Sequence, residues 1–309
     1  SGSPQWGFAG VYICFALRGF LVFRSARHAV PAPGILLFVK RRLLRIYLGY
    51  WPVLLLIAIT TVFAYHSSLP PLKKMVFSAL LLYPNIWDNW LLPAWSLTME
   101  IYFYLWIAAI AMLPQRHQLK AIIFGLALLA TWGAGWLVAN HSAVFAGQQP
   151  LRYALTGLGI EFLAGALVAY LYEGRPQPFR RPYIAIATCV GFMAAGIALG
   201  MTSPYFDRVE VMRAGSFGVA GIAALVAALA LEQTRHTPPH WLVTLGDASF
   251  SLYLLHTFLL DFSGKVRMAL GIASPEGLLV FLLALPIAIV MISRFWYSWV
   301  EKPIMKAAL

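Results

Sequence analysis

Apolar stretches of about 20 residues, the length that a membrane-spanning helix needs, recur along the whole chain between short polar segments. The pattern predicts nine spanning helices, at 7–23, 46–65, 95–113, 121–139, 153–172, 183–201, 214–231, 241–260 and 277–297. A shorter apolar piece, 75–83, is too brief to cross a bilayer and is expected to lie at an interface or to re-enter. The predicted fold class is all-α, a polytopic transmembrane helical bundle.

Composition agrees with this class and excludes others. The chain is 61% hydrophobic and 11% charged, whereas a soluble domain carries roughly 25% charged residues. Of the 23 Lys and Arg residues, fourteen fall in the loops 24–45, 114–120, 173–182 and 232–240 and at the C-terminus, and seven in the opposite loops. The positive-inside rule therefore places the C-terminus in the cytoplasm. The net charge of +12 indicates membrane topology and not nucleic-acid binding, since no soluble basic domain exists to hold a duplex.

The same topology places residue 1 outside the cytoplasm, and the chain does not begin with Met. We therefore expect one preceding helix, so that a complete protein would have ten spans. Loops are short and no internal repeat is evident, so residues 1–309 are expected to form a single transmembrane domain that lacks its first helix.

A carboxylate lies inside the span predicted at 95–113. Glu100 shares a helix face with Ser96 and Tyr104, four residues away on either side, and Trp95 flanks them. A charge at membrane depth is costly, and such residues usually face a cavity or a partner and serve a function. Glu100 could orient a catalytic base or bind a hydroxyl substrate. The alternative is an ion pair, with Arg18 for example, that locks the bundle.

One histidine also lies within a span. Ser249, Tyr253 and His256 follow i, i+4, i+7 spacing and give one helix face a hydroxyl, a phenol and an imidazole. Histidine can take a proton from an alcohol near neutral pH. A satisfied interhelical hydrogen bond explains the pattern equally well.

Basic residues precede the second predicted span, in the segment Lys40-Arg41-Arg42-Leu43-Leu44-Arg45. Arg41 and Arg45, and likewise Arg42 and Arg45, share a helix face and could hold a phosphate-bearing ligand through bidentate contacts. Alone, the cluster is more typical of a topology signal that faces anionic lipids.

Two further intramembrane charges call for partners. Glu161 shares a face with Gly157 and Gly165, a small-residue pattern that favours close helix packing, and its carboxylate could pair with Arg152 or Arg18. Arg18 lies in the middle of the first predicted span and needs an anionic partner or a cavity. No phosphate-binding glycine loop, nucleophile elbow or paired-histidine metal helix is present, so metal and redox functions have little support.

Motifs follow one another along nearly the whole chain: Gly7-Phe8-Ala9-Gly10-Val11 with Phe15-Ala16-Leu17-Arg18-Gly19-Phe20, then Arg42-Leu43-Leu44-Arg45-Ile46-Tyr47, then Trp95-Ser96-Leu97 with Glu100 and Phe103-Tyr104, then Ser249-Phe250-Ser251-Leu252-Tyr253-Leu254-Leu255-His256, and finally Glu301-Lys302-Pro303. Their order and spacing resemble the integral-membrane acyltransferase-3 family, which moves acyl groups onto sugars and related substrates. Arg18 departs from the serine that the family carries at this place. The family's catalytic histidine, with an arginine ahead of it, lies on a helix upstream of the Gly7–Val11 stretch, and no residue here matches either.

The resemblance implies an O-acyltransferase with acyl-CoA, and in the first place acetyl-CoA, as donor and no metal. Its phosphates would be held from the cytoplasm by the arginines Arg41, Arg42 and Arg45. The acceptor would be a hydroxyl of a glycan or lipid-linked sugar. The predicted catalytic residues are Glu100, Tyr253 and His256: Glu100 could orient the family's upstream histidine, which would be the base, and Tyr253 and His256 could line the acceptor or acyl path. The expected substrate contacts are Trp95, Ser96, Tyr104 and Arg18. Membrane lipid would surround the protein in the bacterial inner membrane.

Two other functions remain open from the sequence. Buried Glu, Arg and His side chains also mark the pathway of a transporter or flippase for a polar or lipid-linked substrate. A non-catalytic receptor or scaffold is the second alternative. Release of free thiol from acyl-CoA separates the enzyme from the transporter, because a transporter releases none.

Overall fold

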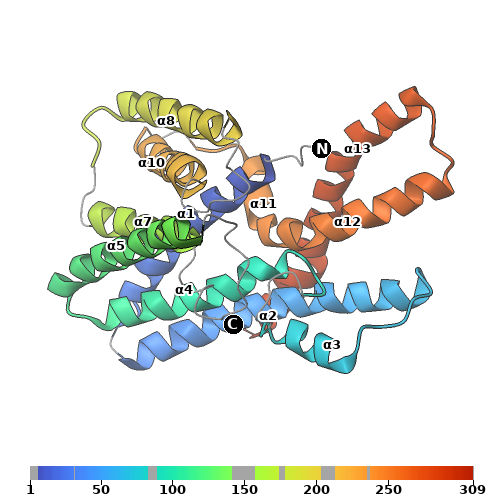
Figure 1. Cartoon of the computed structure of the whole chain (residues 1–309), viewed down its shortest axis with the longest axis horizontal. Coiled ribbons are helices and arrows are strands. Elements are labelled where there is room, and N and C mark those ends of the chain that lie inside the picture. The colour runs from blue at the N-terminus through green and yellow to red at the C-terminus, as the bar shows by residue number, and fades with distance from the viewer. Residues whose placement is uncertain are drawn as a thin grey trace. The chain divides into compact units, whose positions relative to one another are not determined.

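The computed structural model describes residues 6–30, 32–82, 89–140, 157–173, 178–202, 213–234 and 237–308, none of which lies in a strand (Figure 1). The described elements are α1 (Trp6–Arg27), α2 (Ala32–Phe63), α3 (Leu72–Ala79), α4 (Ala94–Met112), α5 (Gln115–Asn140), α7 (Leu158–Tyr172), α8 (Pro182–Thr202), the π-helix η2 (Ala214–Gly218), α10 (Val219–Glu232), α11 (His240–Asp247), α12 (Ser249–Ala269), α13 (Pro275–Trp296), the π-helix η3 (Tyr297–Glu301) and α14 (Lys302–Ala308). The predicted all-helical class is confirmed.

Six described helices are long and apolar enough to cross a membrane: Pro33–Phe63, Ala94–Met112, Gln115–Gly135, Pro182–Met201, Ala214–Glu232 and Pro275–Ala308. The pair α11 and α12, bent by 67°, is a seventh candidate. The predicted number of nine is not confirmed. The described part of α7 has 15 residues, and α1 carries Arg18, Arg24 and Arg27. Residues 153–156 of one predicted span lie outside the described residues.

The exposed surface of these helices is apolar, which indicates that it faces lipid. The apolar windows of α8 and α13 are each only 11% buried, although their mean hydropathies are 2.1 and 2.5. Leu283 and Ile287 on α13 are 66% and 67% exposed. Soluble proteins rarely expose contiguous apolar surface of this kind, whereas lipid covers it at no cost. The protein is a multi-pass membrane protein.

Two compact units share the chain. Unit 1 comprises Ser1–Val39 and Ile101–Thr237, and unit 2 comprises Lys40–Glu100 and Pro238–Leu309. The helices α2 and α4 each contribute residues to both units.

In unit 1, α1 packs against α7 and α10, and α5 packs against α7. Gly19 of α1 lies against the backbone of Phe162, and Gly165 of α7 lies against the backbone of Ala16. A Cβ at either glycine would collide with the facing main chain, so glycine lets the two helices approach this closely. The packing role predicted for Gly165 is confirmed. Glu161, with 1% of its surface exposed, lies against Gly218 in η2.

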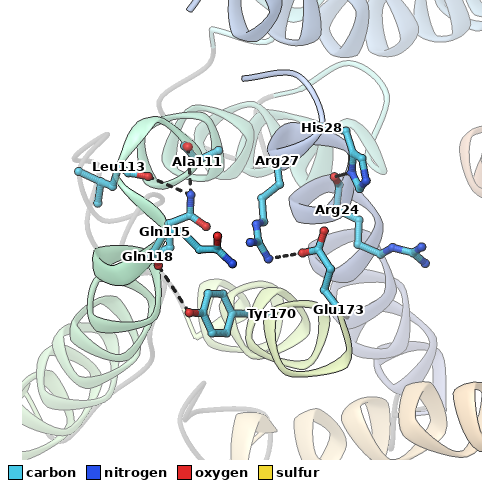
Figure 2. Close-up of polar contacts among 9 residues, drawn as sticks. All are labelled: Arg24, Arg27, His28, Ala111, Leu113, Gln115, Gln118, Tyr170 and Glu173. Carbon is cyan, nitrogen blue, oxygen red and sulfur yellow. Dashed lines mark hydrogen bonds and ion pairs between the residues drawn. The ribbon is translucent and has the colours of Figure 1, made fainter. Parts of the chain in front are cut away.

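A polar junction joins helix ends of unit 1 (Figure 2). Arg27, the last residue of α1, forms an ion pair with Glu173, which directly follows α7. Its guanidinium also lies 5.3 Å from the ring centroid of Tyr170, whose hydroxyl donates to the Gln115 carbonyl at 3.5 Å. Gln118 on α5 donates to the carbonyls of Ala111 and Leu113 at 3.1 and 2.9 Å. The two Gln118 contacts satisfy carbonyls at the C-terminal end of α4 and directly after it, where intrahelical donors are lacking.

In unit 2, the short helix α3 is fixed to α2 by side chains. Tyr47, Tyr50 and Trp51 of α2 donate to the carbonyls of residues 80, 78 and 79 at 2.9, 3.1 and 2.9 Å. Those carbonyls lie in the last turn of α3 and directly after it, where few intrahelical donors remain, although the Ser78 carbonyl also accepts from the Leu81 N–H at 3.1 Å. With eight residues, α3 is too short to span, as the sequence predicted.

The far end of α12 is tied to the residues that follow α2. Tyr65 donates to the Asp261 carboxylate at 3.2 Å, and the Lys265 ammonium lies 2.9 Å from the centroid of the Tyr65 ring. Burial, and then the neighbouring Asp261, raise the pKa of the Tyr65 phenol. The phenol therefore remains protonated and continues to donate at neutral pH.

Candidate functional site

The first turns of α4 place three predicted residues in unit 2. The helix begins at Ala94, directly after Pro93, where the missing proline N–H costs nothing because the first N–H groups of a helix have no intrahelical acceptor. Ser96 donates from its hydroxyl to the Pro93 carbonyl at 3.2 Å. Ser96 and Glu100 are 2% and 3% exposed, and Trp95 is half-buried. The carboxylate of Glu100 thus lies in the interior of a candidate span.

The start of α12 meets the same backbone carbonyl. Tyr253 donates from its phenol to the Pro93 oxygen at 3.2 Å, so the hydroxyls of Ser96 and Tyr253 share one acceptor, which has two lone pairs. Two segments that are 160 residues apart in the chain are brought together at this point. The structure places two of the predicted motifs side by side in unit 2.

His256 lies one turn further along α12 and is half-buried. Its Nδ1 is 2.5 Å from the Tyr253 carbonyl oxygen, and the two rings are 5.7 Å apart between centroids. A carbonyl oxygen can only accept, so Nδ1 carries the proton of the neutral ring, and Nε2 has the lone pair. The predicted imidazole is therefore held in the tautomer that can accept a proton through Nε2.

The predicted arginines follow one another on α2. Arg41 and Arg45 are exposed and Arg42 is half-buried, as expected of groups that could meet an anionic ligand. Arg45 lies within electrostatic range of Glu301 and Tyr297, on the η3 segment after α13.

Glu301 is the functional candidate that the residue pattern missed. It is 4% exposed and accepts a hydrogen bond from the hydroxyl of Ser251, which belongs to the same turn of α12 as Tyr253. The only sequence signal for Glu301 was its place in the Glu301-Lys302-Pro303 motif, because spacing cannot show that residues 50 positions apart meet.

Arg18 and Tyr104, the remaining predicted site residues, belong to unit 1. Arg18 is half-buried on α1. Tyr104 is 4% exposed, and its ring centroid lies 6.5 Å from that of Phe162 on α7. Phe103 beside it packs against Phe162 and Phe15 at 5.1 and 5.7 Å. Tyr104 is thus part of the aromatic core of unit 1.

The side chains gathered in unit 2 are suited to proton transfer and anion binding. They comprise hydroxyls, an imidazole with a defined tautomer, buried carboxylates and exposed guanidinium groups, the groups used in general acid–base catalysis and phosphate recognition. Within the described ranges, no three His, Cys, Asp or Glu side chains are grouped so as to hold a metal ion.

Comparison with known proteins agrees with this chemistry. Residues 2–293 match the family model Acyl_transf_3, described as an acyltransferase domain. The chain is 27% identical over 311 residues to the exopolysaccharide production protein ExoZ of Rhizobium meliloti (strain 1021), an alignment that covers 97% of this chain and 90% of that protein. No solved structure matches the chain.

Proposed function

The chain belongs to the acyltransferase-3 family, and we propose that it transfers an acyl group, in the first place acetyl, from acyl-CoA to a hydroxyl of an exopolysaccharide or of its lipid-linked precursor. The similarity to a protein named for exopolysaccharide production supports a carbohydrate acceptor. The excess of Lys and Arg in alternate loops supports a bacterial inner-membrane location with the C-terminus and the donor in the cytoplasm.

The observation that carries the proposal is the meeting of Ser96 and Tyr253 at one carbonyl, with the Nε2 lone pair of His256 one turn away. Acyl transfer to an alcohol requires a base for the hydroxyl proton and hydrogen-bond donors near the reacting carbonyl. The imidazole supplies the first, and the hydroxyls of Ser96 and Tyr253 can supply the second by turning from the Pro93 carbonyl to the reacting carbonyl.

The reaction then follows from these groups. His256 Nε2 accepts the proton of the acceptor hydroxyl while the oxygen of that hydroxyl forms a bond to the thioester carbon. The carbon–sulfur bond breaks, the sulfur leaves with the electron pair, and the imidazolium returns the proton to give the free CoA thiol. Glu100 supplies a carboxylate that orients and stabilises the protonated base. Trp95 is assigned to a substrate contact, whereas Tyr104 belongs to the aromatic core of unit 1.

Donor binding is assigned to the arginines of α2. Arg41, Arg42 and Arg45 precede the apolar part of α2, where guanidinium groups can form bidentate hydrogen bonds with the phosphates of CoA. Arg41 and Arg45 are exposed on the helix, so their N–H donors can be reached from outside the protein.

Thiol release tests the proposal. Purified full-length protein in detergent is given acetyl-CoA and an exopolysaccharide or lipid-linked acceptor, and free thiol and ester are measured together. We expect one ester per thiol, and loss of both in Glu100→Gln that keeps the wild-type melting temperature. The matched control is Glu276→Gln, which removes an exposed carboxylate from the first turn of α13 and should leave the rate unchanged. Absence of thiol release from wild type would contradict the proposal and favour transport.

A further inference from the structure

Glu301 is held in one place although it carries a carboxylate into the protein interior. It is 4% exposed and lies in the π-helical turn Tyr297–Glu301 that joins α13 to α14. The hydroxyl of Ser251 on α12 donates to it. Burying a charge is costly unless a partner compensates, and π-helical turns occur frequently at functional sites. The carboxylate therefore calls for a role beyond packing.

The packing of α2 against α12 brings Arg45 toward Glu301. Gly49 lies against the ring of Phe250, and a Cβ at this position would collide with it. Phe250 precedes Ser251 on α12, so this close approach brings α2 toward the residue that binds Glu301. Arg45 lies four residues before Gly49, on the same face of α2, and within electrostatic range of Glu301.

The difference in exposure between Glu301 and Arg45 suits the buried carboxylate to hold the exposed guanidinium. Arg45 is exposed and Glu301 is buried. A guanidinium has five N–H donors in a planar fork, so a carboxylate can occupy some of them while the others remain available to a phosphate. Fixing a long side chain before the ligand arrives reduces the entropy lost on binding, which raises affinity.

We propose that Glu301 is a positioning residue for the donor site, which holds the Arg45 guanidinium in the orientation that binds a phosphate of acyl-CoA. The inference rests on the proposed function, since it presumes an acyl-CoA donor at Arg45. Ser251 donates to the carboxylate, and the carboxylate attracts the guanidinium of Arg45 electrostatically. Loss of the charge should therefore weaken donor binding and leave the rate at saturating donor unchanged.

Binding of desulfo-CoA, which cannot be acylated, measures this directly on the purified full-length protein. Glu301→Gln keeps an oxygen for Ser251 and removes the charge, and we expect its Kd to rise about three- to tenfold, the effect of immobilising one long side chain. Arg45→Ala should raise the Kd at least as much, and the double variant no more than Arg45→Ala alone. In transfer assays, the KM for acetyl-CoA should rise with kcat within about twofold, and Glu301→Asp should recover part of the affinity.

Controls separate the possible failures. Glu276→Gln changes an exposed carboxylate on α13, the helix that η3 follows, and it should leave the Kd unchanged. If Glu301→Gln lowers the melting temperature, Ser251→Ala provides the second test, with a smaller rise in Kd expected. An unchanged Kd in folded Glu301→Gln, or additive effects in the double variant, would overturn the positioning role while leaving the acyltransferase function standing. Wild type that binds no desulfo-CoA would overturn both the donor assignment and the role of Glu301.

Discussion

Polar side chains serve two different purposes in the two units. In unit 1, the pair of Arg27 and Glu173 and the amide of Gln118 join the ends of helices to one another. In unit 2, the hydroxyls of Ser96 and Tyr253 share one carbonyl on the inner turns of α4 and α12. The contacts in unit 1 connect helix ends, whereas the hydroxyl oxygens of Ser96 and Tyr253 and the Nε2 lone pair of His256 keep acceptors for a substrate. The comparison predicts that substitutions of the polar residues on α4 and α12 near Pro93 affect turnover and that substitutions at the helix-end contacts of unit 1 affect stability.

The largest expected effect is at His256. Replacing His256 by Gln removes the Nε2 lone pair, and kcat should fall by about 10²- to 10⁴-fold, the usual contribution of a general base, with an unchanged melting temperature. The matched control is His240→Gln, since His240 is exposed at the start of α11 and should leave kcat unchanged. If kcat in His256→Gln stays within twofold of wild type, His256 is not the base and lines the acceptor path.

Unit 1 should respond in the opposite way to overpacking. In Gly165→Ala, the added Cβ meets the backbone of Ala16, and α1 and α7 must separate, so we expect a loss of about 1–3 kcal/mol in the free energy of unfolding. The control is Gly191→Ala on α8, where nothing lies within 4 Å of the new Cβ. Unfolding in mild detergent, followed by tryptophan fluorescence, compares the two. Equal stability of both variants would show that α1 and α7 are not in close contact at Gly165.

A smaller effect is expected where two hydroxyls share an acceptor. Tyr253→Phe removes one donor from the Pro93 carbonyl, and Ser96 still satisfies it. The cost in stability should be about 1 kcal/mol or less, and turnover should fall severalfold if the phenol also faces the reacting carbonyl. Combining Tyr253→Phe with Ser96→Ala leaves the Pro93 carbonyl only the backbone N–H of residue 96 as a donor, at 3.3 Å, so the double variant should lose slightly more than the sum of the single ones. Strict additivity would contradict a shared carbonyl.

These contacts also show where sequence reasoning ends. The apolar pattern predicts the part of each helix that crosses the membrane but not its polar ends. Accordingly α2 begins at Ala32 and not near 46, and α5 at Gln115 and not near 121, because the polar segments 40–45 and 115–120 are helical without being apolar. The Pro93 carbonyl has no sequence signal, since every residue carries such a group. Arg27 counted only toward topology in the sequence, whereas in the fold it is the partner of Glu173.

The least severe change should be at that ion pair. Arg27 and Glu173 have 13% and 28% of their side-chain surface exposed, so water screens the pair in part, and Arg27→Gln should lower the free energy of unfolding by only about 1 kcal/mol. The exchange Arg27→Glu with Glu173→Arg should recover part of this loss, and salt should reduce the difference between wild type and Arg27→Gln. Turnover should stay near wild type in all three proteins, because unit 1 uses this pair to hold α1 to α7. A fall in kcat of tenfold or more without a change in stability would place this junction among the groups that handle substrate, and the division between the two units would no longer hold.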